Sequence, residues 1–381
     1  MRLGRLWAVA WKEFLHIVRD PRSLAMALAL PVLLLFLFGY ALTLDVDRVP
    51  LVLWDQSDSP AGRELISRFA GSRYFSVRGY AGDYRQLERA LDRREALAGL
   101  VIPREFAARV ASGRPAQVQL ILDGSDSNTA AIAAGYADAV VDSYSAEVLL
   151  RFVQRTRGAA AVPLLRPPLD LRPRVWFNTE LESKNYIVPG LIAVVIAVIA
   201  ALLTSLTVAR EWERGTMEQL ISTPVKGSEL IAGKLLPYFL IGMFDVLVAV
   251  LMGEFLFHVP LRGSVALLAC TSAVFVTGAL SLGLLISVAT RNQLLANQLA
   301  FVTTFLPSFL LSGFIYAIRN MPPPVQAITH VFPARYFIAI LKSIYLKGVG
   351  LEVLAGEAAL LVVFGAAMVA LANLRFRKKL G

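Results

Sequence analysis

The chain has 381 residues, of which 56 % are hydrophobic and only 17 % are charged, and its formal net charge is +10. Because soluble domains contain about 45–50 % apolar and about 25 % charged residues, this composition excludes a purely soluble protein and favours an integral membrane protein. Residues 45–186 carry 19 Lys and Arg against 18 Asp and Glu, so the positive excess lies in the hydrophobic remainder of the chain. A bias of basic residues toward one membrane face explains this excess better than a nucleic-acid partner does.

Residues 1–22 have the pattern of an amphipathic helix on the cytosolic membrane surface. Most charges lie away from one apolar helical face, which contains Leu3, Leu6, Trp7, Ala10, Phe14, Ile17 and Val18. Pro21 breaks this helix before the first long apolar run. A basic amphipathic helix with tryptophan is typical of a helix that lies in the membrane interface. A plain cytosolic extension of the first span is the alternative.

Six apolar stretches are long enough to cross the roughly 30 Å of membrane hydrocarbon, which takes about 20 helical residues. These spans are predicted at 23–44, 186–209, 235–257, 264–289, 294–318 and 352–374. Each must be a helix, because backbone polar groups in lipid need internal partners. The first stretch is too long for the apolar region of a signal peptide and has no clear cleavage site after it, so we expect an uncleaved anchor.

The distribution of basic residues predicts the orientation. If the N-terminus is cytosolic, the short flanks on that side hold 14 Lys and Arg, whereas the opposite short flanks hold 5. Since cytoplasmic flanks carry the excess of Lys and Arg, we expect both termini, including the basic tail 375–381, to be cytosolic. Residues 45–185 then face outward.

The outward segment reads as one α/β domain. Predicted strands alternate with predicted helices; the strands are at 50–54, 74–78, 99–102 and 117–122, and the helices are near 59–69, 83–96, 103–111 and 129–155. This alternation predicts an α/β sandwich with a mixed or parallel sheet. Residues 158–174 are rich in proline and predict a stiff extended linker back to the membrane.

One loop of this domain has oxygen-rich side chains. Asp123, Ser125 and Ser127 are spaced as in loops that hold Mg²⁺ or Ca²⁺. The alternative, which we favour, is a strand-to-helix turn whose Ser and Asn side chains cap the long helix. The three histidines lie far apart and there is one cysteine, Cys270, so the sequence predicts no metal site and no cofactor on this chain.

The loop at 210–234 predicts a short rigid helix outside the membrane. Gly215 can end the helix that leaves the second span. Thr216 and Gln219 have the spacing of a capping box, with Thr216 as N-cap, so a new helix is expected near 217–222 and Pro224 stops it. Lys226 to Glu229 then cap the next membrane helix. Such a helix is suited to docking in a groove of a cytosolic partner; an ordinary capped turn is the equally weighted alternative.

A few polar side chains fall inside the predicted spans. A carboxylate near the middle of a bilayer costs at least a few kcal/mol unless it faces protein or water. Asp245 in the third span is therefore a candidate site residue. Its possible roles are a substrate contact, a proton site or a structural hydrogen-bond partner. The structural role is slightly favoured because no second charge pairs with it. The other candidates are Glu254 near the outer interface and the fifth-span residues Asn297, Gln298, Ser308 and Ser312.

Taken together, several motifs resemble the ABC-2 type exporter permeases. They are Glu211-Trp-Glu-Arg-Gly-Thr-Met-Glu-Gln-Leu220 with Thr223-Pro224, Tyr186-Ile-Val-Pro-Gly190, Ser312-Gly-Phe-Ile315, and Asn320-Met-Pro-Pro with Phe332-Pro-Ala-Arg-Tyr336. The resemblance covers the whole chain. It is closest to the bacterial multidrug-efflux subgroup that has a large domain between spans 1 and 2.

The resemblance implies a fold, partners and a site. It implies a six-span exporter permease in the bacterial inner membrane, with short helices at 319–351 that dip into the outer leaflet. It implies an ATPase-coupling loop made of Glu211, Glu213, Arg214, Gly215, Thr216, Met217, Glu218, Gln219, Leu220, Thr223 and Pro224. It also implies a separate ABC ATPase, as two copies or a fused pair, that binds ATP and Mg²⁺, and a second permease copy or sister permease. A periplasmic adaptor and an outer-membrane channel are further candidate partners.

The chain itself has no motif for enzymatic work. There is no Gly-x-x-x-x-Gly-Lys-[Ser/Thr] phosphate loop, no His-Glu-x-x-His and no Gly-x-Ser-x-Gly, so we expect no ATP hydrolysis by this chain. The function expected is export of a drug-like, amphipathic or lipid-like molecule, powered by the partner ATPase. Three alternatives remain: a proton-coupled secondary transporter that uses Asp245, a membrane sensor with an outer ligand-binding domain, and a structural anchor of an envelope complex.

Overall fold

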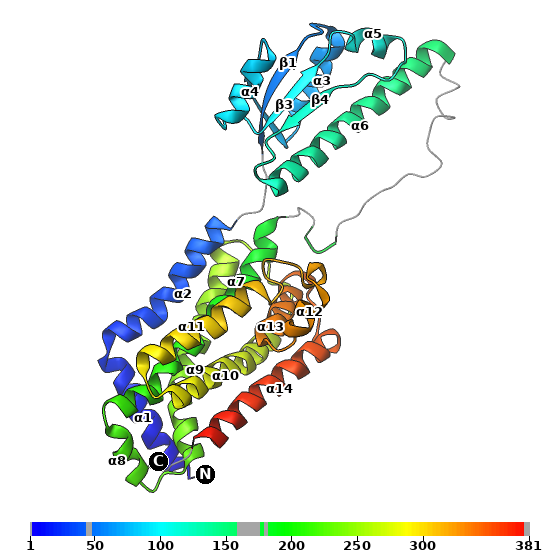
Figure 1. Ribbon diagram of the computed structural model, residues 1–381. Helices are drawn as coiled ribbons and strands as arrows, with labels where there is room; N and C mark the ends of the chain where they lie inside the picture. Colours follow the sequence, from blue (N-terminus) through cyan, green and yellow to red (C-terminus); the bar gives the residue numbers. More distant parts are fainter. Residues whose placement is uncertain (1, 43–47, 158–175, 179–181, 377–381) are drawn as a thin grey trace. The chain divides into compact units, whose positions relative to one another are not determined.

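The computed structural model describes residues 2–42, 48–157, 176–178 and 182–376. The chain forms two compact units, a helical unit of Met1–Thr43 with Arg174–Gly381 and an α/β unit of Leu44–Pro173 (Figure 1). The described elements of the α/β unit lie within the predicted outer segment 45–185, which also includes the return linker. The predicted proline-rich linker at 158–174 and residues 377–381 of the predicted basic tail lie outside the described residues.

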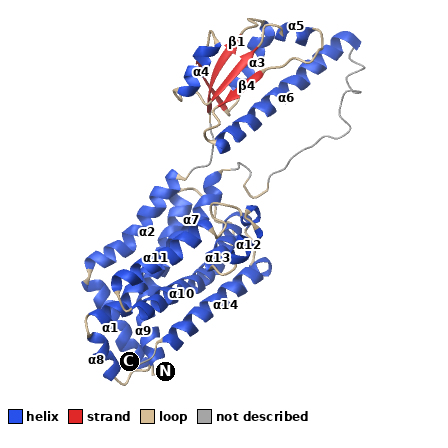
Figure 2. Cartoon of the chain, in the orientation of Figure 1, coloured by secondary structure: helices blue, strands red, loops and turns tan. Residues whose placement is uncertain are grey.

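The helical unit is built from helices alone, as Figure 2 shows for its described residues. In chain order the α-helices are α1 Leu3–Arg19, α2 Pro21–Ala41, α7 Ser183–Glu213, α8 Thr216–Ser222, α9 Gly227–Leu251, α10 Val265–Thr290, α11 Gln293–Leu310, α12 Pro323–Thr329, α13 Pro333–Lys342 and α14 Leu351–Arg375. Short π-helical turns at Met252–Leu256 and Ser343–Lys347 extend α9 and α13, and a 3₁₀ turn lies at Ile318–Asn320.

Four of the described helices are long and apolar enough to cross a membrane. They are Ser183–Glu213, Gly227–Leu256, Val265–Thr290 and Leu351–Arg375. The apolar part of α2, Ala27–Ala41, is shorter. The fifth span is predicted to reach residue 318, but α11 ends at Leu310. The chain turns shortly after this end, at Gly313, whose φ of +81° lies in the left-handed region. The first and fifth predicted spans are thus shorter apolar helices than expected.

Helix α7 lies at the centre of the helical unit. Its residues from Ile187 to Ala201 are almost all buried, and it packs against α2, α9, α10, α11 and α13. The contact with α10 is close: a Cβ at Gly283 would lie 2.2 Å from the carbonyl oxygen of Ala201. Thr204 adds a hydrogen bond of 2.7 Å from its Oγ1 to the carbonyl oxygen of Leu280. Small residues at such a crossing let helix backbones approach in a membrane.

This close approach predicts that Gly283→Ala destabilises the helical unit. The added methyl group must push α7 and α10 apart, and overpacking of this kind costs about 1–3 kcal/mol. The expected result is a lower thermal unfolding midpoint of the purified protein in detergent. Gly356→Ala in α14 is the matched control, because a Cβ there meets nothing within 4 Å. Equal midpoints for the two variants would show that the helices can separate without cost.

The α/β unit has a four-stranded mixed sheet between helices. Its elements are β1 Val49–Asp55, α3 Pro60–Gly71, β2 Phe75–Tyr80, α4 Tyr84–Asp92, β3 Ala98–Ile102, α5 Phe106–Ala111, β4 Gln119–Leu122 and α6 Ser127–Arg157. The strand order is β2-β1-β3-β4; β1 pairs in parallel with β2 and β3, whereas β4 is antiparallel to β3. A mixed sheet is one of the two arrangements that the sequence predicts.

Helices cover both faces of this sheet (Figure 1). On one face, α3, α5 and α6 pack on the strands around a buried core; this core contains Val49, Leu51, Leu65, Phe69, Phe75, Leu100, Phe106 and Tyr144. On the other face, Leu87 of α4 packs against Val52 and Val101. The central strands β1 and β3 thus bury apolar side chains on two sides, which explains why their sequences are nearly continuous in apolar residues.

The oxygen-rich loop of Asp123, Ser125 and Ser127 is a turn that begins α6, as the favoured interpretation predicts. Asp123 Oδ1 accepts hydrogen bonds from the backbone N–H and the hydroxyl of Ser125, at 2.9 and 2.6 Å. Asp126 caps α6 by accepting from Asn128 N–H and the Thr129 hydroxyl, at 3.1 and 2.6 Å, so the expectation that Ser or Asn provides the cap was wrong. These bonds lower the pKa of both aspartates. The carboxylates are occupied locally, as a turn requires.

Candidate functional site

Helix α8 leaves the end of α7 through a single glycine. Gly215 has φ +70°, so the chain reverses there without the strain that a side chain would add. The predicted capping box at Thr216 is wrong: Gly215 is the N-cap, and the Thr216 hydroxyl instead donates to the carboxylate of Glu211. The physical reason is that Glu211 lies one turn earlier on α7 and offers a charged acceptor, which is stronger than a backbone group.

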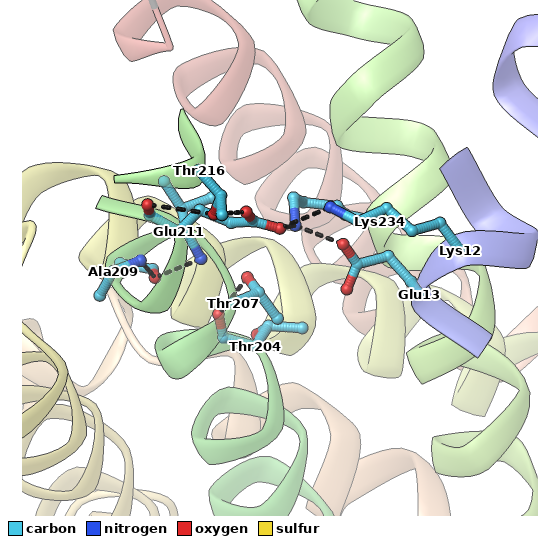
Figure 3. A network of polar contacts seen from close by, with 10 residues as sticks. Lys12, Glu13, Thr204, Thr207, Ala209, Glu211, Thr216 and Lys234 are labelled. Atoms are coloured by element: carbon cyan, nitrogen blue, oxygen red, sulfur yellow. Dashed lines mark hydrogen bonds and ion pairs between the residues drawn. The ribbon is translucent and has the colours of Figure 1, made fainter. Parts of the chain in front are cut away.

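Around this point lies a cluster of buried charges, drawn in Figure 3. The Lys234 ammonium of α9 lies 2.5 Å from Glu13 Oε1 of α1 and 3.4 Å from Glu211 Oε1 of α7. Lys12 of α1 reaches the same Glu211 oxygen at 2.9 Å. The side chain of Lys234 is only 2 % exposed and that of Glu13 only 6 %. Two cations and two carboxylates therefore neutralise one another, as buried charges require, with the 40 % exposed Lys12 at the edge of the cluster.

We call Lys12, Glu13, Glu211, Thr216 and Lys234 the charge cluster. Its members come from α1, α7, α8 and α9, so it ties four helices together at one point. Glu211 and Thr216 are among the site residues that the sequence predicts, whereas Glu13 and the role of Lys234 are not. A signal was present: Glu13 falls between Ala10 and Ile17 on an otherwise apolar helical face, where an unpaired carboxylate would be costly.

An apolar contact holds α8 from the same side. Met217 is 2 % exposed and packs in a buried group with Val9 of α1, Val208 of α7, Leu230 and Ile231 of α9, Leu284 of α10 and Phe376. The other face of α8 is solvent-accessible: Glu218, Gln219 and Ser222 are exposed, and Leu220 is half-buried. Met217 and the Thr216 hydroxyl therefore anchor the short helix, which presents its polar side outward.

The ends of the loop are also bonded to neighbouring helices. The Glu213 carboxylate accepts from the Gln293 N–H of α11 at 2.7 Å, and the Arg5 guanidinium of α1 donates to the Pro224 carbonyl at 2.5 Å. Glu229 accepts from Lys226 N–H at 3.0 Å, which confirms that it caps α9, and also from Arg2 N–H at 2.7 Å. A displacement of α8 must therefore move α1, α7, α9 or α11 as well.

The remaining predicted loop residues lie at the rim of this arrangement. Arg214, Gly215 and Pro224 are exposed, and Thr223 is half-buried, with its hydroxyl donating to the Leu220 carbonyl at 2.7 Å. The start of α1 and the end of α14 lie at the same end of the helical unit as α8 (Figure 1). This is the end where the sequence predicts the cytosolic flanks.

The polar candidates of the predicted spans do not gather at one place. Asp245 is 3 % exposed, and its Oδ2 has no hydrogen-bond partner among the described residues. Glu254 is exposed in the π-helical turn after α9, and Asn297 and Gln298 are exposed on α11. The buried pair Ser308 and Ser312 is satisfied locally, because the Ser312 hydroxyl donates to the Ser308 carbonyl; this is the packing role that polar span residues often have.

The described fold and site define a class. Several apolar helices of membrane length surround α7, and a short anchored helix projects at one end, so the protein is a polytopic helical membrane protein. The profile of the family described as ABC-2 family transporter protein matches residues 21–374. The chain belongs to this family and is a permease of the ABC-2 type.

Curated relatives extend this result over the whole chain. The chain is 38% identical over 346 residues to "Probable multidrug ABC transporter permease YbhS" of Escherichia coli K12, which covers 90% of this chain and 89% of that protein. It is 32% identical to "Probable multidrug ABC transporter permease YbhR" of the same organism, over 98% of this chain and 99% of that protein. It is 23% identical to "Linearmycin resistance permease protein LnrN" of Bacillus subtilis, over 96% and 97%.

Proposed function

We propose that this permease is the transmembrane subunit of an ATP-driven exporter and that α8 docks on a separate ABC ATPase. The observation that carries the proposal is the geometry of α8: one face is anchored by Met217 and Thr216, and the opposite face exposes Glu218 and Gln219. A helix that presents a fixed polar face is suited to a groove on a partner. ATP and Mg²⁺ belong to that partner, since this chain has no phosphate loop.

The proposed topology has six spans, cytosolic termini and the α/β unit outside the bacterial inner membrane. It is supported by the 14 to 5 distribution of basic residues between the two sets of short flanks. It is also supported by α1, which buries Val9, Ala10 and Ile17 and leaves a row of apolar side chains exposed: Leu3, Trp7, Trp11, Phe14 and Val18. Such a row belongs in the membrane interface. Helices α12 and α13 are the short helices proposed for the outer leaflet.

The proposed assembly has two permeases and two ATP-binding units. The second permease is a copy of this chain or a sister subunit, and the apolar residues exposed on α2 and α11 are available for it or for lipid. A periplasmic adaptor and an outer-membrane channel complete the route where the envelope has two membranes. From the names of the relatives, we propose a drug-like, amphipathic or lipid-like cargo.

The proposed mechanism begins at α8 and proceeds through the charge cluster. Closure of the ATPases on ATP displaces α8. Because Thr216 binds Glu211, and Glu211 binds Lys12 and Lys234, the displacement reaches α1, α7 and α9 together. Helix α7 carries the motion into the bundle, since it packs on α2, α9, α10, α11 and α13. A polar network whose groups are bonded to one another is rigid, so the charge cluster can pass the motion from one helix to the next.

The test is co-purification of the ATPase with permease variants changed on the exposed face of α8. Glu218→Arg reverses the charge of that face without touching Met217 or Thr216, so retention of the ATPase is expected to fall by about ten-fold, the effect of losing one desolvated charge contact. Glu352→Arg, an exposed carboxylate at the first turn of α14, is the control. Undiminished retention by the α8 variant would place the docking surface elsewhere on the permease.

A further inference from the structure

A cavity of about 600 Å³ opens on the surface of the helical unit beside the charge cluster. It is lined by residues of α1, α2, α7, α8, α9 and α11. One part of its wall is hydrocarbon: Leu30, Ile199, Leu202, Leu203, Leu206 and Ile241. Its volume is in the range of roughly 300–1,000 Å³ that is common for small-molecule sites.

The other part of the wall is charged, with three cations, Lys12, Arg210 and Arg214, and three carboxylates, Glu13, Asp20 and Glu211. Lys12, Glu13 and Glu211 line the cavity, but with Lys234 they form the neutral charge cluster. Arg210 and Arg214 also line it, one helical turn apart on α7. The guanidinium groups of these two arginines make no hydrogen bond or ion pair with any residue that the structure describes, whereas Asp20 on the same wall already has a partner.

We propose that this cavity binds an anionic amphiphile. The acidic group lies against Arg210 and Arg214, and the hydrocarbon chain lies along the apolar wall of α7 and α9. A guanidinium offers a planar pair of donors that matches carboxylate and phosphate, and it is weakly hydrated, so it suits a partly dry site. A zwitterionic headgroup with the same chain is bound less well, because its cationic part meets two arginines. The shared chemistry fits an acidic phospholipid as well as an anionic cargo.

The occupant also contacts the helix that we propose to be docked on the ATPase. Thr216, Gln219, Leu220 and Thr223 of the loop line the same cavity. An anionic amphiphile in the cavity therefore changes the surroundings of α8 directly. This coupling rests on the proposed function, whereas the binding itself does not.

Binding is tested by photolabelling of the purified permease in phosphatidylcholine nanodiscs. One sample contains a trace of phosphatidylglycerol with a photoreactive acyl chain, and the other contains phosphatidylcholine with the same chain. Labelled peptides are identified by mass spectrometry. Phosphatidylglycerol is expected to label the segments around 199–206 and Ile241 about five-fold more than phosphatidylcholine, the ratio that one modest charge-assisted contact provides.

Three double variants make the test specific. Arg210→Gln/Arg214→Gln is expected to lower phosphatidylglycerol labelling to the phosphatidylcholine level, and Arg210→Lys/Arg214→Lys to retain most of it because the charge remains. Arg19→Gln/Arg375→Gln removes two exposed arginines that do not line the cavity, and should leave the labelling unchanged. Equal labelling by the two lipids, or labelling that survives the glutamine variant, would overturn the proposal.

Two further measurements distinguish a cargo from a resident lipid, and binding in the cavity from the docking of α8. With the ATPase and ATP present, a cargo leaves the labelled segments during turnover, whereas a resident lipid remains. Selective labelling of the permease, together with a Glu218→Arg variant that still retains the ATPase, would reject the docking role of α8 and leave the binding site standing; Glu218 does not line the cavity.

Discussion

Replacing Lys234 by methionine is expected to destabilise the helical unit more than any other single change in the charge cluster. Lys234 is 2 % exposed and lies within 4 Å of two carboxylates, Glu13 and Glu211. Lys234→Met leaves the buried Glu13 carboxylate without an ion-pair partner among the residues that the structure describes. Breaking a buried ion pair by removing one partner costs about 3–5 kcal/mol. The thermal unfolding midpoint of the purified protein should fall accordingly.

The double variant Lys234→Met/Glu13→Leu separates charge from packing. It removes one cation and one carboxylate, so Lys12 and Glu211 remain as a neutral pair at 2.9 Å. Because apolar side chains of similar volume can replace a buried ion pair at little cost, most of the lost stability should return. If Glu211 and Lys234 transmit motion from α8, the double variant folds but stimulates the partner ATPase weakly. A double variant no more stable than Lys234→Met would show that Glu13 is not held by this pair.

Asp245→Asn is expected to lower export several-fold without lowering the amount of inserted protein. Asp245 is 3 % exposed in α9, and its Oδ2 has no hydrogen-bond partner in the described part of the chain. A carboxylate at the centre of a membrane helix costs roughly 2.5–3.5 kcal/mol or more. The structural role that the sequence slightly favours needs a hydrogen-bond partner, and no described residue provides one for Oδ2, so a role in transport is now the better explanation. Asparagine has nearly the same shape and cannot ionise, so folding is preserved.

The measurement is efflux from cells or vesicles, normalised to the permease level in the membrane. Ser308→Ala is the control, since Ser308 is also buried in a predicted span and the hydrogen bond from Ser312 uses its backbone carbonyl. Export by Asp245→Asn equal to wild type would leave Asp245 with a structural role. Export that needs a proton gradient and no ATPase would favour the secondary-transporter alternative.

Much of the architecture could be read from local sequence patterns. The long apolar stretches predict the membrane-length helices, because hydrocarbon thickness sets a minimum length. Alternating strand and helix patterns predict the α/β unit, and the structure has its strands at Val49–Asp55, Phe75–Tyr80, Ala98–Ile102 and Gln119–Leu122. Gly215 predicts the end of α7, since a left-handed residue is readily provided by glycine.

Local patterns were less reliable where a side chain had a choice of partners. Thr216 has the spacing of a capping residue, yet it binds the Glu211 carboxylate. Ser127 follows Asp126 in a loop that resembles a metal site, yet Asp126 caps α6. The end of the fifth predicted span was misplaced because hydropathy continues past Leu310, where the backbone turns at Gly313. In each case the hydrogen-bonding geometry, which composition does not contain, decided the outcome.

By itself, the sequence determined that this is a membrane protein, how its helices and strands follow one another, and that a short helix stands after α7. Only the tertiary structure decided which charges meet. Lys234 and Glu13 are separated by 221 positions in the chain and joined by 2.5 Å in space. Buried charges need partners, but the sequence states only that a partner is needed. The packing of α1 against α9 determines which residue it is.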